Sequence, residues 1–129
     1  MKRDMELVRA ILFALEEKEN SNVTRGLKVD GYSGETVPYH CKMMHEAGMI
    51  DFYSESRTGN GSIYLYQVGN LTWYGQEYLE QIRQDTVWNR TKDVIKDKGL
   101  PMALDIIKEV SAAIIEPVVK GAVKGLAGQ

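Results

Sequence analysis

Apolar residues recur every three to four positions over residues 4–18, which predicts an amphipathic helix there. The apolar positions are Met5, Val8, Ile11, Leu12 and Leu15. Asp4 is placed to cap this helix. A second helix is predicted from Glu35 to Ala47, with Ser33 as its cap and Gly48 as its stop. Pro38 allows this helix to start near Val37, or two short helices to meet there.

Two β-prone runs follow, over residues 49–56 and 62–68. Gly59-Asn60-Gly61 lies between them and tolerates the backbone angles of a tight turn, so the pair predicts a hairpin. Alternation places Ile50 and Phe52 on one face of the first strand, with Asp51, Tyr53 and Glu55 on the other. A short strand is also expected around Leu27 and Val29.

The last third of the chain is predicted to be helical. Thr72 caps a helix over residues 73–84, and a further helix runs from Asp85 or Thr86 to the region of Gly99. Another begins at Pro101 and is interrupted by Pro117.

This order of elements predicts an α+β fold. Helix, short strand, helix, hairpin and helix over residues 1–84 is the order of a winged helix-turn-helix domain. Residues 85–129 form a C-terminal helical extension. In such a domain the helix before the hairpin faces outward, and the hairpin is the wing.

Charge opposes the function that this fold most often has. The chain of 129 residues has a formal net charge of -2 and a sequence pI near 5.7. Residues 1–84 carry 9 Lys and Arg against 12 Asp and Glu, whereas residues 85–129 carry 7 against 6. The expected DNA-binding domain is therefore the acidic part, although nucleic-acid binding is usually marked by a basic patch.

The single cysteine, Cys41, excludes an internal disulfide and a cysteine-rich zinc module. Asp4 and Glu6 interrupt any signal-peptide core, and the sequence lacks an apolar run of the length that spans a membrane. We therefore expect a cytoplasmic protein.

Several separated blocks resemble one family of small proteins. The blocks are Met1-Lys-Arg-Asp-Met, Gly31-Tyr-Ser, Tyr39-His-Cys-Lys-Met-Met-His-Glu-Ala-Gly-Met-Ile50, Leu71-Thr-Trp-Tyr-Gly-Gln-Glu-Tyr-Leu-Glu-Gln-Ile-Arg83 and Asp85-Thr-Val-Trp88. They resemble an uncharacterised family found in phages, prophages and Gram-positive bacteria. That resemblance implies a winged-helix fold with a variable helical tail, but no settled function. Cys41, Met43 and Met44 stand where the family pattern prefers leucine, and Gln76 stands near an expected histidine.

A DNA-reading surface would use the outward helix and the wing. Its candidate residues are Tyr39, His40, Lys42, Met43, Arg57, Asn60 and Ser62. The alternative is an ordinary solvated helix face, on which Lys42 and Glu46 pair across one turn. Glu35 and Glu46 would repel phosphates from that face.

Other chemistry finds little support in the sequence. Cys41 and His45 are four residues apart, with His40 adjacent, but Cys41 faces the expected core and both histidines are expected at the surface. The same placement argues against a Cys-His nucleophile. We therefore expect neither catalysis, nor a cofactor, nor a metal site.

The C-terminal helix has an apolar stripe with little left to pack on. The candidate dimerisation residues are Ile106, Ile107, Val110, Ile114 and Val118. A membrane surface is one alternative partner, because Lys120 and Lys124 interrupt an apolar tail. Packing on the domain itself is another. We favour a symmetric homodimer, which would also space two winged helices on a palindromic site.

Two hypotheses for function follow. The first is a phage or prophage winged-helix protein that binds double-stranded DNA as a transcriptional regulator. The second is a phage accessory or interaction module that binds a host protein without binding DNA.

Overall fold

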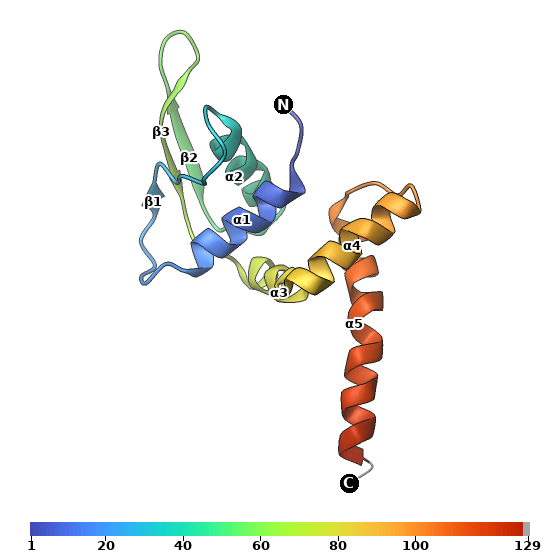
Figure 1. Ribbon diagram of the computed structural model, residues 1–129. Coiled ribbons are helices and arrows are strands. Elements are labelled where there is room, and N and C mark those ends of the chain that lie inside the picture. The colour runs from blue at the N-terminus through green and yellow to red at the C-terminus, as the bar shows by residue number, and fades with distance from the viewer. Residues whose placement is uncertain (128–129) are drawn as a thin grey trace. The chain divides into compact units, whose positions relative to one another are not determined.

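The computed structural model describes residues 1–127, and these divide after Leu79 into two compact units. Helix α3 crosses the division between the two units. Figure 1 shows the elements in chain order. They are α1 (Met5–Glu16), β1 (Thr24–Arg25), α2 (Thr36–Glu46), β2 (Tyr53–Arg57), β3 (Ile63–Val68), α3 (Trp73–Ile82), α4 (Asp85–Asp97) and α5 (Leu104–Ala127). The α+β composition predicted from the sequence is confirmed.

The first unit combines α1, α2 and a three-stranded antiparallel sheet in the order β1-β3-β2. Helices α1 and α2 contact each other, and α2 also contacts β2 (Figure 1). The core of this unit is built from the apolar positions that the helical spacing identified. Its buried members include Val8, Ile11, Leu12, Cys41 and Met44, together with Leu7, which that spacing did not identify.

Local capping signals set the ends of the helices. Asp4 caps α1, because its Oδ1 accepts hydrogen bonds from the backbone N–H groups of Glu6 and Leu7. Gly48 has a φ of 84° and ends α2 as predicted. Its N–H donates to the carbonyl of His45, and Met49 N–H donates to that of Met44, which is the Schellman pattern.

Several details differ from the sequence-based expectation. Glu35, rather than Ser33, is the cap residue of α2, and Pro38 lies within the first turn of one continuous helix. The short strand lies at Thr24–Arg25 instead of around Leu27 and Val29. In these cases the position of the element depends on contacts distant in sequence: Thr24 and Arg25 pair with β3.

The faces of the hairpin also differ from the prediction. Ile50 is buried and makes an isolated bridge with Leu71, whereas Phe52 is 41% exposed, so the two do not share a face. The ladder begins only at Tyr53, because Ile50 belongs to the connection after α2. A register shift between Ser56 and Arg57 leaves Tyr64 unpaired in β3, which is a β-bulge.

The second unit packs α4 against α5. The end of α3 contributes Gln81, whose Nε2 donates 2.6 Å hydrogen bonds to the Lys108 carbonyl and to Ser111 Oγ. Helix α5 continues through Pro117, so the predicted interruption there is wrong. The proline lacks one N–H group, but the helix accommodates it on an exposed side. Within the described residues, the helices are too short or too polar to cross a membrane.

Candidate nucleic-acid interface

The outward face of α2 carries three of the predicted DNA-binding residues. Lys42 is exposed, while Tyr39 and Met43 are half-buried. Cys41 and Met44 point to the opposite side and are buried in the core. This separation follows from the helical repeat, since residues one position apart differ by about 100° around the axis.

His40 is not at the surface, contrary to prediction. Its exposed fraction is 0%, so it is removed from the set of candidate DNA-contacting residues. The backbone N–H of Asp4 donates to His40 Nε2 over 2.7 Å, and His40 Nδ1 lies 2.8 Å from the Thr36 carbonyl. An amide can only donate and a carbonyl can only accept, so both contacts require the neutral ring with its proton on Nδ1. The buried polar ring is thereby satisfied.

Asp4 joins the start of α2 to two other parts of the unit. Besides capping α1, its Oδ2 accepts a 3.1 Å hydrogen bond from Tyr32 Oη in the loop before α2. Partial burial raises the pKa of Tyr32, and the hydrogen bond to Asp4 raises it further. The orientation of α2 therefore depends on Asp4, Tyr32 and His40 together.

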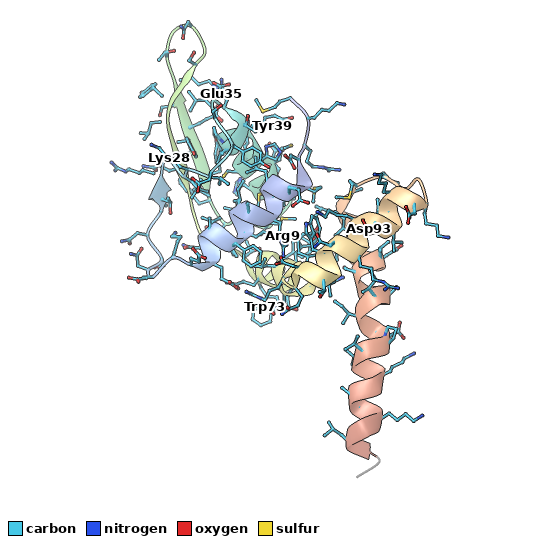
Figure 2. The ribbon with its side chains drawn as sticks, in the orientation of Figure 1. Arg9, Lys28, Glu35, Tyr39, Trp73 and Asp93 are labelled. Carbon is cyan, nitrogen blue, oxygen red and sulfur yellow. The ribbon has the colours of Figure 1, made fainter. Side chains whose placement is uncertain are left out.

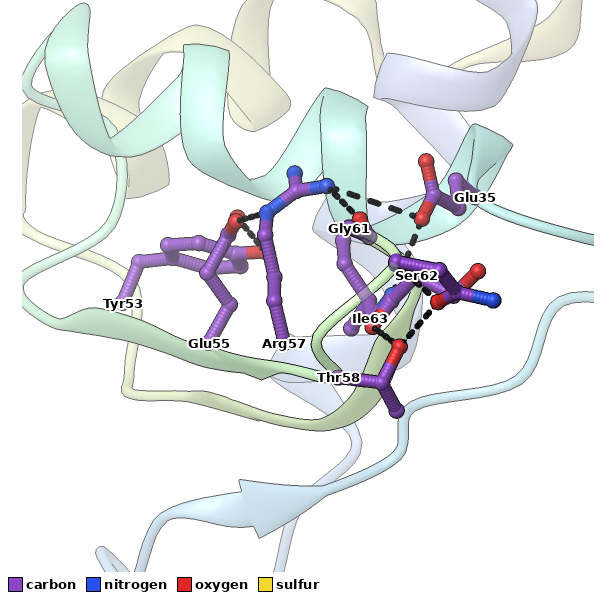
Figure 3. A network of polar contacts seen from close by, with 9 residues as sticks. Glu35, Tyr53, Glu55, Arg57, Thr58, Gly61, Ser62 and Ile63 are labelled. Atoms are coloured by element: carbon purple, nitrogen blue, oxygen red, sulfur yellow. Dashed lines mark hydrogen bonds and ion pairs between the residues drawn. The ribbon is translucent and has the colours of Figure 1, made fainter.

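Arg57 lies at the end of β2 and is held by acidic side chains (Figure 3). Its Nε lies 2.5 Å from Glu55 Oε2, and one terminal nitrogen lies 3.8 Å from Glu35 Oε1. The same nitrogen donates a 2.6 Å hydrogen bond to the Gly61 carbonyl. The hydrogen bond to Glu55 raises the pKa of the Arg57 guanidinium.

Glu55 is held in its ionised form by this arrangement. Burial acts to raise its carboxyl pKa, but hydrogen bonds from Tyr53 and Arg57 outweigh that effect and hold the pKa below its usual range. The Tyr53 hydroxyl donates over 2.9 Å to Glu55 Oε1. The charge of Lys42 on α2 lowers the same pKa, so the helix and the hairpin share one electrostatic environment.

Glu35 has a role that the sequence did not reveal. Its Oε1 accepts a 3.0 Å hydrogen bond from the backbone N–H of Ile63, besides its ion pair with Arg57. Glu35 therefore bridges the start of α2 and the hairpin, and the two form one surface (Figure 3). The sequence predicted only that Glu35 would repel phosphates. It did not reveal this bridge, because Glu35 and Ile63 are 28 residues apart.

Asn60 and Ser62 lie in the exposed turn of the hairpin, where they hold the turn together. Asn60 Oδ1 accepts hydrogen bonds from the Thr58 hydroxyl and from the Ser62 backbone N–H. Thr58 N–H donates to the Ser62 carbonyl over 2.8 Å. The side chains predicted to contact DNA from the wing are thus placed together at its tip.

Cys41 is a buried thiol with an unreactive environment. Burial raises its pKa to about 12, so the thiolate that nucleophilic or metal chemistry needs is disfavoured. Over residues 1–127, the structure contains no group of three or more His, Cys, Asp or Glu side chains that could hold a metal ion.

Trp73 is the most exposed aromatic residue that the sequence did not select as a site. It begins α3 and is 82% exposed (Figure 2). Large apolar side chains are normally covered, and tryptophan is enriched at the energetic centres of protein interfaces. Its place beside the capping residue Thr72 gave no sign of exposure in the sequence.

The predicted dimerisation residues fall into three groups on α5. Ile107 is fully buried within its own chain, so it is not available to a second copy and that assignment is wrong. Ile106, Val110 and Ile114 are half-buried. Val118 is 72% exposed and lies in the stretch 116–126, in which every residue is exposed.

Comparison with known proteins identifies relatives without assigning a function. Residues 2–101 match a family described as hypothetical proteins, DUF2513. A protein of Haemophilus influenzae, described as uncharacterized, is 42% identical over 118 residues, which cover 89% of this chain and 96% of the relative. No solved structure matches the chain. The prediction of an uncharacterised family is confirmed, and the chain belongs to the DUF2513 family.

Proposed function

We propose that residues 1–84 form a winged-helix domain. Support comes from the chain order α1, β1, α2, β2, β3 and from the strand order β1-β3-β2, in which the hairpin follows directly after a helix with an outward face. One feature departs from the usual motif. Residues 26–35 form turns rather than a helix, so α2 is the single helix between β1 and β2.

We propose that this domain belongs to a phage or prophage regulator that binds double-stranded DNA. The observation that carries the proposal is the bridge from Glu35 to Ile63 and Arg57, which makes the outward face of α2 and the hairpin one surface. Lys42, Tyr39 and Met43 would face base edges in the major groove, and the hairpin would approach the adjacent backbone.

The charges on this surface imply weak binding. Arg57 is paired with two carboxylates, so Lys42 is the cation of the surface best placed to meet a phosphate. Because DNA affinity depends on the number of phosphates that are neutralised, we expect binding at low salt and its loss near physiological salt. The regulator would act at high local concentration or with a partner.

The test is fluorescence anisotropy with labelled duplexes of random and palindromic sequence, over a series of salt concentrations. Lys42→Ala should lower the slope of log affinity against log salt by about 1. Lys96→Ala, at the end of α4, is the matched control and should leave the slope unchanged. The proposal is wrong if no duplex binds at about 50 mM salt, where phosphate contacts are strongest.

A second variant tests the role of the acidic bridge. Glu35→Gln keeps an acceptor for the Ile63 N–H but removes the charge that pairs with Arg57. If DNA binds here, the affinity should rise by about two- to fivefold, which corresponds to about 0.5–1 kcal/mol. Unchanged or weaker binding would place the DNA elsewhere.

The alternative function, an accessory module that binds a host protein, is favoured by one observation. Trp73 is 82% exposed, whereas Arg57, the arginine best placed to contact DNA, is already paired with Glu55. A photo-crosslinking residue at position 76, which is exposed in the same turn of α3, would capture the partner in cells while keeping Trp73. The purified partner should then bind the wild-type chain and Gln76→Ala but not Trp73→Ala. Binding that survives Trp73→Ala would exclude this surface.

We further propose that the protein acts in the cytoplasm, as a homodimer and without catalysis. A dimer would present two copies of α2, and paired half-sites raise the affinity of a weak DNA-binding surface.

A further inference from the structure

The end of α5 is an amphipathic helix with an uncovered apolar side. Residues 116–126 are all exposed. Val118, Ala122 and Leu126 follow one another at intervals of four, so they form a ridge that continues Val110 and Ile114. Glu116, Lys120 and Lys124 occupy the opposite side, where Glu116 and Lys120 form a 2.7 Å ion pair.

This segment is also a poor helix on its own. Pro117, Gly121 and Gly125 lie inside it, and proline and glycine are the least favourable residues in a helix interior. Most helices in proteins persist because an apolar face is packed against a partner. Within residues 1–126 the structure provides that partner for the first half of α5, which α4 covers, but not for the second half.

The same unit contains a groove between α4 and α5. Its volume is about 850 Å³, and its lining includes Val87, Arg90 and Val94 from α4 with Val110, Ile114 and Val118 from α5. That volume holds roughly two turns of a helix about 10 Å across. The segment Val118–Leu126 is about two and a half turns long, so the groove and the uncovered segment match in size.

We propose that the end of α5 from a second copy of this chain occupies the groove, and that the exchange is reciprocal. The second unit contains both an apolar groove and an exposed apolar helix segment. Each of two copies can therefore place its segment in the groove of the other, which gives a closed two-fold interface. The two α5 helices run antiparallel, with the axis near Val118. Ala122 of the second copy then lies beside Ile114, and Leu126 of the second copy beside Val110, because the ridge has equal spacing on either side of Val118.

The charges favour a second copy over a lipid surface. Lys120 and Lys124 are the basic residues of the segment 116–126, and Glu116 pairs with Lys120, so the polar face carries little net positive charge. A helix that lies on an anionic membrane usually carries a strongly cationic face and large aromatic residues beside its apolar one. Helix α5 contains no aromatic residue. The dimer does not depend on DNA binding, so the two proposals fail separately.

The test compares two valine substitutions in the same helix. Val118 and Val123 are both exposed and differ by about 140° around the axis, so Val118→Asp disrupts the ridge while Val123→Asp changes the other side. At about 100 µM, where a micromolar Kd leaves the chain paired, light scattering should give twice the 14.6 kDa chain mass for wild type and Val123→Asp. Val118→Asp should give the single-chain mass, with an unfolding midpoint that no longer depends on concentration.

Three outcomes would overturn the proposal. The first is a single-chain mass for the wild type at that concentration. The second is dissociation by Val123→Asp with no effect of Val118→Asp, which would place the interface on the opposite side of α5. The third is sedimentation of a monomeric wild type with vesicles of anionic lipid, lost in Val118→Asp, which would make the apolar ridge a membrane contact.

Discussion

Gly75→Ala should destabilise the first unit, although alanine is the better helix former. Gly75 lies in the first turn of α3, and a Cβ atom there would stand 2.3 Å from the Met49 carbonyl oxygen. That oxygen has no freedom to withdraw, because it accepts a 2.9 Å hydrogen bond from Thr72 N–H. The Thr72 hydroxyl also donates to the Gly48 carbonyl and accepts from Gly75 N–H. Two hydrogen bonds from Thr72 therefore fix the start of α3 against the end of α2, and a third caps α3 itself.

The size of the effect follows from opposing contributions. Overpacking of this kind costs about 1–3 kcal/mol, and loss of the hydrogen bond from Thr72 to Met49 costs about 1 kcal/mol more. Replacement of glycine by alanine in a helix returns up to about 1 kcal/mol. The net expectation is a loss of about 1–3 kcal/mol. For a chain of this size that is a decrease in Tm of roughly 4–12 °C.

Urea and thermal unfolding followed by far-UV circular dichroism would measure this loss. Gln76→Ala is the matched control, because Gln76 is exposed in the same turn, and it should change the free energy of unfolding by less than about 0.5 kcal/mol. If Gly75→Ala is as stable as wild type, the close approach of α3 to Met49 is not rigid and the reasoning fails.

Three further predictions concern single side chains. Tyr78 is buried and its hydroxyl lacks a hydrogen-bond partner among the described residues, so Tyr78→Phe should leave stability unchanged or raise it by up to about 1–2 kcal/mol in urea unfolding; a clear loss would contradict this. Tyr53→Phe removes a hydrogen bond that lowers the pKa of Glu55, so that pKa should rise toward about 4.3 in a carboxyl NMR titration. Because the pKa of Glu55 is lower in the folded chain than in the unfolded chain, its contribution to stability is present above about pH 4.3 and fades as the pH falls through the folded pKa. In Tyr53→Phe the folded pKa is higher, so this contribution should be lost at a higher pH than in the wild type. Burial raises the pKa of Cys41 to about 12, so the native chain should react with a thiol reagent at about pH 8 far more slowly than the chain in denaturant, and equal rates would refute its burial.

Local signals in the sequence were sufficient for most elements. Asp4, Thr72 and Gly48 mark helix ends through contacts with residues only two to five positions away, so each can be read without knowledge of the fold. The hairpin was equally predictable, because Gly59-Asn60-Gly61 supplies the turn between two β-prone runs. These elements place Lys42 and Asn60 at the surface, as predicted.

The candidate interface was less predictable because its decisive contacts span long stretches of sequence. His40 lies on the border of the helical wheel, and a backbone N–H that lies 36 residues away turns it inward. Arg57 looks like a phosphate-binding residue until Glu35 and Glu55 are seen on either side of it. Such pairings depend on how the helix and hairpin meet, which neither periodicity nor composition specifies.

The contacts of Asp4 have a consequence for any altered form of this protein. One residue provides the cap of α1, an acceptor for Tyr32 and, through its backbone, the donor to His40. A chain that begins at Met5 would lose all three contacts in one step, whereas removal of residues 1–2 would leave them intact, because Asp4 keeps its peptide N–H only while Arg3 precedes it. Cleavage after Lys2 should therefore give a chain in which α2 is held correctly, whereas cleavage after Asp4 should give one in which that helix is loose.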